Sequence, residues 1–273
     1  MEKVIAIFWD CDNTLVDGYM QNPITDYYHL EPGRFWRDVF SIPAKHPGVK
    51  FDSETTYLNY YLDCIEQGLC PGLNNERLRW AGSQVTLFPG LPDFLKDAKE
   101  LAASLGARLE HHVVFTGFAE ALRGASFFPD LDGWWGCEMA EGPDADGNPV
   151  LKQPAYTLDN LTKARAFYEV HAGMDSHDPK AIRTPVEYKN MIYVADGPGD
   201  EKMMESVTRL GGRGMTVWGD PNPVQGRGPN ARAGAQALLD QGLCRACCKA
   251  DYTKNGEAAL WLFAQIRELA AAE

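Results

Sequence analysis

Val4-Ile5-Ala6-Ile7-Phe8-Trp9-Asp10-Cys11-Asp12-Asn13-Thr14-Leu15 is an apolar run that ends abruptly in polar residues. Its first six residues are mostly β-branched or aromatic, which is typical of a strand buried on both faces of a parallel sheet. Ligands of open α/β sheets gather at the carboxyl ends of such strands. The stretch therefore predicts an α/β fold with a polar site just beyond its first strand.

The acidic pair at the end of this strand predicts a metal site. Asp10 and Asp12 lie one residue apart, so both can reach the same point beyond the strand. Two carboxylates about 4 Å apart repel by roughly 4 kcal/mol at an effective dielectric near 20. A divalent cation would offset that repulsion, and Mg²⁺ suits such oxygen ligands best. The competing interpretation is a strand followed by an Asx turn, where Asp and Asn are common.

Two later strands are predicted to end in polar side chains at the same edge of the sheet. The apolar run 113–115 leads into Thr116, and the run 190–195 leads into Asp196 and Asp200. Strands that alternate with helices form a mostly parallel sheet, so their carboxyl ends lie together. We therefore expect four carboxylates and a hydroxyl to surround a phosphate and a metal ion.

The spacing between the first two strands predicts an inserted module. From Thr14 to Thr116 the chain runs 102 positions (116 − 14), whereas a plain β-α-β unit takes roughly 30 residues or a little more. The excess is rich in aromatic residues and in helical periodicity. We therefore predict a core domain from residues 1–17 and 86–273, and a helical cap domain from residues 18–85.

Periodicity and turn residues predict the remaining elements. The predicted helices cover 34–40, 53–65 with Ser53 as the N-cap, 75–85, 91–105, 118–124, 160–170, 201–210, 231–241 and 257–271. The predicted strands cover 4–9, 113–115, 190–195 and 215–218, and the segment 127–151 is predicted to be mainly loop, with a polar turn at 144–148.

Asp-x-Asp-x-Thr after an N-terminal strand resembles the first motif of the haloacid dehalogenase superfamily. The second motif of that family is a strand ending in Thr or Ser, matched by Thr116, and the fourth is Gly/Ala-Asp-Gly-x-x-Asp, matched by residues 195–200. The motifs span nearly the whole chain. The resemblance implies a Rossmann-like parallel sheet with helices on both faces, plus a mainly α-helical cap between the first two motifs.

The resemblance also implies the activity and the roles of single residues. It implies a phosphatase of small phosphomonoesters in which Asp10 forms an aspartyl-phosphate and Asp12 is the general acid and base. It further implies that Thr116, with Gly117, binds the phosphoryl group. The implied cofactor is Mg²⁺, and its predicted site comprises Asp10, the backbone carbonyl of Asp12, Asp196 and Asp200.

A lysine that pairs with Asp10 and the phosphate is the third motif of the family. We assign it to Lys163, near the start of the helix that precedes the third predicted strand, because that resembles the usual placement. Lys152, Lys180 and Lys189 are the alternatives.

The cap of this family closes over the site and supplies specificity. Candidates for substrate contact here are Tyr19, Arg34, Trp36 and Arg37, although we prefer an ordinary structural role for any single one of them.

The overall composition narrows the class of partner. With 26 basic and 38 acidic side chains the formal net charge is −12, which argues against a nucleic-acid or anionic-membrane surface. The seven cysteines are an odd number and do not predict a disulfide framework. No apolar run is long enough to span a bilayer, and the first strand leaves no room for a signal peptide. We expect a cytoplasmic protein that acts on a small phosphorylated metabolite.

Two alternatives share much of this pattern. A phosphomutase or a phosphonate-cleaving enzyme has the same fold, and the latter needs a cap lysine, for which only Lys45 and Lys50 are available. A non-enzymatic phospho-acceptor domain also combines acidic residues, Thr and Lys around Mg²⁺. In that domain, however, the phosphorylated Asp stands on a later strand than the acidic pair.

Overall fold

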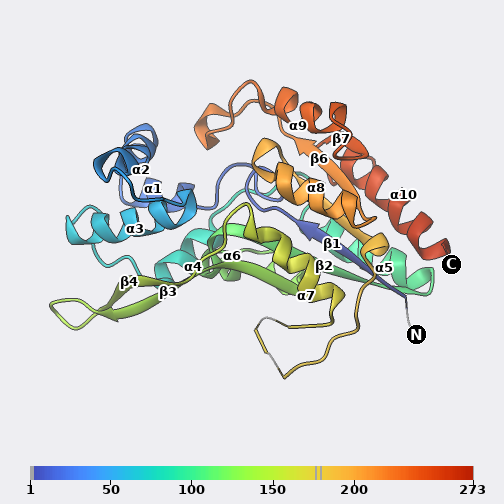
Figure 1. Ribbon diagram of the computed structural model, residues 1–273, viewed down its shortest axis with the longest axis horizontal. Helices are drawn as coiled ribbons and strands as arrows, with labels where there is room; N and C mark the ends of the chain where they lie inside the picture. The colour runs from blue at the N-terminus through green and yellow to red at the C-terminus, as the bar shows by residue number, and fades with distance from the viewer. Residues whose placement is uncertain (1–2, 176, 179, 273) are drawn as a thin grey trace.

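A seven-stranded sheet forms the centre of the computed structural model, which describes residues 3–175, 177–178 and 180–272. The strand order is β4-β3-β2-β1-β5-β6-β7 (Figure 1). All neighbouring strands are parallel except β3 and β4, which are antiparallel. The strands are β1 (Lys3–Trp9), β2 (Ala107–Phe118), β3 (Gly133–Pro143), β4 (Pro149–Tyr156), β5 (Met191–Ala195), β6 (Arg213–Trp218) and β7 (Ala246–Lys249). The predicted α/β fold with a Rossmann-like sheet is confirmed.

Helices cover both faces of this sheet (Figure 1). They are α1 (Asn22–Tyr27), α2 (Pro32–Lys45), α3 (Ser53–Glu66), α4 (Asn75–Ser83), α5 (Asp93–Ser104), α6 (Ala119–Gly124), α7 (Arg165–His171), α8 (Glu201–Arg209), α9 (Ala231–Asp240) and α10 (Glu257–Ala271). None of the helices formed by the described residues has the length and hydropathy needed to cross a bilayer.

Neighbouring residues of β1 show why both faces are covered. Side chains alternate between the two faces of a strand. The Phe8 ring packs edge-on against Phe167 of α7 at 4.7 Å between centroids, and the next residue, Trp9, packs against Phe94 of α5 at 6.1 Å. Phe263 of α10 in turn lies 5.1 Å from Phe94. Residues 4–9 of β1 are apolar and buried because helices cover both faces of the sheet.

The segment between β1 and α5 forms the four helices α1 to α4. The first three lie together at the end of the molecule away from both termini (Figure 1). Helix α3 is capped by Asp52, whose carboxylate accepts from the backbone N–H of Thr55 at 2.8 Å, so the predicted cap at Ser53 is wrong by one residue. The division of the chain into a core and a cap domain stays a prediction.

Helix α4 packs tightly on α6, the helix that follows β2. A Cβ added at Gly82 would lie 1.8 Å from the carbonyl oxygen of Ala121, and one added at Gly124 would lie 1.8 Å from that of Arg79. Only glycine allows two backbones to approach so closely. This pair of glycines therefore fixes the end of the inserted segment against the sheet layers.

The segment predicted to be loop contains two strands. Strand β3 begins beside β2 in parallel register and continues as an antiparallel hairpin with β4, which extends beneath α3 (Figure 1). The carboxylate of Asp144 accepts from the backbone N–H groups of Asp146 and Asn148 and closes the polar turn. The loop prediction is wrong because glycines and prolines interrupt β3 and β4, although the sheet still pairs them.

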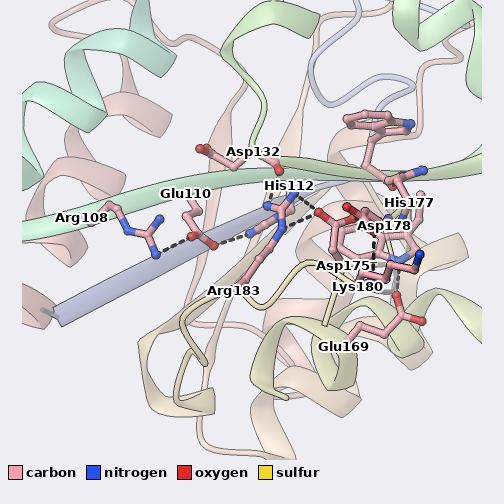
Figure 2. A network of polar contacts seen from close by, with 12 residues as sticks. Arg108, Glu110, His112, Asp132, Glu169, Asp175, His177, Asp178, Lys180 and Arg183 are labelled. Carbon is pink, nitrogen blue, oxygen red and sulfur yellow. Dashed lines mark hydrogen bonds and ion pairs between the residues drawn. The ribbon is translucent and has the colours of Figure 1, made fainter. Parts of the chain in front are cut away.

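A polar network fastens the long connection between α7 and β5 to the sheet (Figure 2). Arg183 donates to the carboxylate of Asp175 through Nε at 2.8 Å and Nη2 at 2.5 Å, and to the carbonyl oxygen of Asp132 through Nη1 at 2.5 Å. On β2, Glu110 lies 3.0 Å from the ring of His112. The contacts of Arg183 fix the chain that leads into β5, the strand that ends just before Asp196.

Candidate active site

The turn after β1 sets the positions of the first two acidic residues. The backbone N–H of Asp10 donates to the carbonyl oxygen of Val194 on β5 at 2.9 Å, and the chain then turns sharply at Asn13, where φ is +54°. Asn tolerates this left-handed conformation better than most residues do. The side chains of Asp10 and Asp12 are therefore held just beyond the edge of the sheet.

A buried lysine joins the ends of β1 and β5. The ammonium nitrogen of Lys163 lies 2.7 Å from Oδ1 of Asp10 and 2.7 Å from Oδ1 of Asp200, and the lysine is only 2% exposed. Lys152, Lys180 and Lys189 are all exposed. The structure thus brings Lys163, and none of the three alternatives, to the acidic cluster.

Asp10, Asp196 and Asp200 form the acidic cluster. Each offers a carboxylate oxygen, and the three oxygens lie within 4.8 Å of one another. Burial raises the pKa of Asp196 well above its usual value, and the charges of Asp10 and Asp200 raise it further. Hard oxygen donors at this spacing, with repulsion that a cation relieves, fit a divalent metal ion such as Mg²⁺.

Asp10 is subject to opposing effects. Its pKa is raised to about 6 as the net result: burial raises it most, the adjacent Lys163 ammonium lowers it, and the Asp200 carboxylate raises it. Thr14, the threonine of the Asp-x-Asp-x-Thr pattern, donates to the second oxygen of Asp10 at 3.3 Å. Both carboxylate oxygens of Asp10 therefore have a partner, which fixes the orientation of the group.

Asp12 lies outside the acidic cluster. Its Oδ1 accepts from the backbone N–H of Met20 at 2.8 Å, and burial raises its pKa to about 8. A carboxyl group with a pKa this high holds a proton near neutral pH and can donate it. Its backbone carbonyl, not its side chain, is the predicted metal ligand.

Asp12 opens on a cavity of about 290 Å³ between the sheet and the helical segment. Thr116 and Gly117 line this cavity, so three predicted site residues share it. The Thr116 backbone carbonyl accepts from the hydroxyl of Tyr57 at 3.1 Å. A Cβ at Gly117 would lie 2.0 Å from the ring of Phe115, which explains the glycine.

The four residues predicted to contact substrate from the cap divide into two pairs. Tyr19 and Trp36 line the cavity. Arg34 and Arg37 are exposed, and Arg34 pairs with Asp38 at 3.7 Å on its own helix. The structure therefore keeps the first pair near the site and directs no arginine of α2 into the cavity.

Comparison with known proteins points to one fold. No family model matches the sequence. An uncharacterized protein of Borreliella burgdorferi (strain B31) is 26% identical over 229 residues, which cover 77% of this chain and 80% of that protein. A haloacid dehalogenase family hydrolase of Salmonella enterica serovar Typhi superposes with a TM-score of 0.56 at 14% identity, covering 94% of this chain and 69% of that one. A phospho-aspartyl intermediate analogue of phosphoserine phosphatase superposes with a TM-score of 0.53 at 16% identity, covering 96% and 98%.

The chain has the haloacid dehalogenase fold. The resemblance inferred from the motifs is thereby confirmed at the level of the fold. The roles of Asp10, Asp12, Thr116 and Lys163 stay predictions, because structural likeness at this identity establishes only how the chain folds.

Two buried residues of this candidate site could not be assigned from the sequence. The hydroxyl of Tyr193 donates a hydrogen bond to Oδ1 of Asp200, the oxygen that also accepts a hydrogen bond from Lys163. Arg227 donates to the side chain of Asn13 at 3.3 Å and pairs with Asp17 at 2.6 Å. The signal for Tyr193 was a single hydroxyl in the apolar β5 run, whereas Arg227 lies in a loop with no periodicity.

Proposed function

We propose that this protein is a Mg²⁺-dependent phosphatase that hydrolyses a small phosphomonoester through a covalent intermediate on Asp10. The observation that carries the proposal is the contact of Lys163 with Asp10 and Asp200 at the carboxyl edge of the sheet, beside Asp12 and the cavity. An oriented carboxylate, a buried cation and a second carboxyl group are what phosphoryl transfer to an aspartate requires.

The first step transfers the phosphoryl group to the protein. A carboxylate oxygen of Asp10 attacks phosphorus, the bond from phosphorus to the leaving oxygen breaks, and Asp12 donates its proton to that oxygen. Thr116 and Lys163 donate hydrogen bonds to phosphoryl oxygens. Asp10, Asp196, Asp200 and the backbone carbonyl of Asp12 would hold Mg²⁺, which when bound neutralises phosphoryl charge.

The second step regenerates the enzyme. Asp12, now ionised, takes a proton from water as the water oxygen attacks phosphorus, and the bond from phosphorus to Asp10 breaks. Phosphate leaves and Asp12 is again protonated. The Asp12 carboxyl group can serve both steps because it lies beside Asp10, and its side chain is free to exchange a proton since it is not one of the predicted metal ligands.

Phosphonate cleavage receives less support from the cavity. That reaction needs a cap lysine near the substrate, yet neither Lys45 nor Lys50 lines the 290 Å³ cavity. Lys50 instead lines a separate cavity on the far side of α3, with Asp63.

The proposal is tested by phosphate release from p-nitrophenyl phosphate in the presence of Mg²⁺. We expect turnover by the wild type and a loss of at least about 10³-fold in Asp10→Asn, since the covalent route has no substitute. Equal turnover by the two folded proteins would overturn the proposal.

A further inference from the structure

The cavity beside Asp12 and Thr116 has a distinctive lining. The leaving group of a phosphate ester would lie in this cavity, because the cavity is lined by Asp12 and Thr116, to which we assign roles in phosphoryl transfer. Its wall is aromatic and acidic, and no lysine or arginine of the described chain lines it. The lining residues are Asp12, Tyr19, Gln21, Trp36, Phe40, Ser53, Glu54, Tyr57, Phe115, Thr116 and Gly117.

Aromatic rings form the wall contributed by the helical segment. Trp36 stacks on Phe40 with 5.7 Å between ring centroids and 25° between planes, and it lies 5.8 Å from Tyr57. The hydroxyl of Tyr57 is bonded to the carbonyl oxygen of Thr116, which fixes this ring against the sheet. Ring faces carry a negative quadrupole, and they attract cations, quaternary ammonium groups above all.

Glu54 adds a buried carboxylate that lacks a cationic partner. It is 8% exposed and accepts hydrogen bonds from two neutral donors, the hydroxyl of Ser53 at 2.6 Å and the side-chain amide of Asn160 at 3.3 Å. None of the ion pairs between described residues involves Glu54. Buried carboxylates are normally paired with a positive charge, so this one is suited to receive it from a ligand.

The carboxylates near Glu54 also favour a positively charged ligand over a negatively charged one. Burial raises the pKa of Glu54, the hydrogen bond from Ser53 lowers it, and the nearby carboxylates of Asp52 and Asp159 raise it. A positive charge brought into the cavity would relieve this repulsion, whereas a second negative charge would increase it.

We propose that the cavity takes the leaving group of an amino-alcohol phosphate, with the cationic nitrogen against Trp36, Tyr57 and the carboxylate of Glu54. This inference rests on the proposed phosphatase function and specifies its substrate class. It also separates this chain from the phosphoserine phosphatases whose fold it shares, because phosphoserine carries a carboxylate for which the cavity provides no cationic side chain.

The test compares four esters in the presence of Mg²⁺: phosphocholine, phosphoethanolamine, phosphoserine, and the uncharged analogue of phosphocholine in which a tert-butyl group replaces trimethylammonium. We expect kcat/KM for the better of the first two to exceed that for the other two by at least about tenfold. Preference for phosphocholine would assign recognition mainly to the rings, and preference for phosphoethanolamine would assign it mainly to Glu54. Equal or faster turnover of phosphoserine or of the uncharged ester would overturn the inference.

Variants on α3 test the carboxylate directly. Glu54→Gln keeps the shape of the side chain. Its single amide oxygen can still accept from the Asn160 amide, and its NH2 group can donate to the Ser53 hydroxyl, so the variant should fold normally. It should reduce kcat/KM for the cationic ester by about tenfold or more, mainly through KM, and change that for the uncharged ester by less than about twofold. Glu66→Gln, at an exposed position of the same helix, is the matched control and should leave both values unchanged. Trp36→Leu should also raise KM for the cationic ester selectively.

The same experiment separates failure of the inference from failure of the proposed function. Turnover of p-nitrophenyl phosphate without preference for cationic esters would reject the substrate class and retain the phosphatase. If no ester is hydrolysed, calorimetric titration of Asp10→Asn with phosphocholine and with its uncharged analogue still decides: selective binding of the cation supports the cavity assignment, and equal or absent binding contradicts it.

Discussion

The side-chain nitrogen of Lys163 lies 2.7 Å from a carboxylate oxygen of Asp10, although 153 positions separate the two residues in the chain. The same nitrogen lies 2.7 Å from Asp200. The buried ammonium compensates the two carboxylates, since its removal would leave both without a positively charged partner. The contact therefore orients the proposed nucleophile and sets its charge.

Replacement of this lysine should damage both activity and stability. In Lys163→Met we expect turnover of p-nitrophenyl phosphate to fall by at least about 10²-fold, because a fixed cation beside the phosphoryl group is lost. We expect the free energy of unfolding to fall by about 3–5 kcal/mol, because buried charge is left unpaired. Lys152→Met, at an exposed lysine, is the control and should change neither quantity. Wild-type turnover in Lys163→Met would show that the contact has no catalytic role.

Asp12 should matter most for substrates with a poor leaving group. Asp12→Asn can still accept the hydrogen bond from the Met20 N–H but has no acidic proton. We expect kcat on an alkyl phosphate to fall by about 10²–10⁴-fold, and phosphoryl transfer from p-nitrophenyl phosphate to fall less, because its phenolate leaves unprotonated. The exposed Asp26→Asn is the control. Equal losses on both esters would argue against a proton donor at this position.

Metal dependence can be measured by binding as well as by turnover. Since burial and mutual repulsion raise the pKa of Asp196, a divalent cation should stabilise the folded chain. We expect Mg²⁺ to raise Tm after exhaustive chelation and to restore turnover, and Asp196→Asn to lose most of both effects. A chelated wild type with full activity and an unchanged Tm on addition of Mg²⁺ would contradict the metal site.

The motifs made most of the core and the acidic cluster predictable, because each motif combines an apolar strand with polar residues at its end. Lys163 could be assigned only through the resemblance, because its place near the start of the helix before β5 matches the usual placement of the lysine of the third motif. The hairpin of β3 and β4 could not be predicted, because the pairing of β3 depends on β2 rather than on the composition of the hairpin. The position of Glu54 in the cavity could not be predicted either, because it depends on how α3 lies against the sheet.

His111 should make the folded chain sensitive to mild acid. Its Nδ1 accepts from the Trp9 indole N–H at 3.2 Å and its Nε2 lies 2.9 Å from the carbonyl oxygen of Leu95, so the neutral ring has a full set of partners. Burial lowers its pKa from 6.5 to about 3. Below about pH 6.5 the unfolded chain takes up a proton that the folded chain does not, so stability falls as pH falls.

Urea unfolding at pH 7 and pH 5 measures this effect. This one group should lower the free energy of unfolding by about 2 kcal/mol between the two pH values. His111→Gln should lose that part of the pH dependence, whereas His46→Gln, at an exposed position, should retain it. The same pH dependence in the wild type and in His111→Gln would show that the buried ring is not responsible.

The covalent step on Asp10 is tested most directly by trapping the intermediate. Borohydride added during steady turnover reduces an aspartyl-phosphate to homoserine, and peptide mass spectrometry then locates the reduced residue. The account predicts homoserine at position 10 in the wild type, only when substrate is present, and none in Asp10→Asn. Active wild-type protein in which Asp10 remains unreduced, or in which a different residue is reduced, would contradict it.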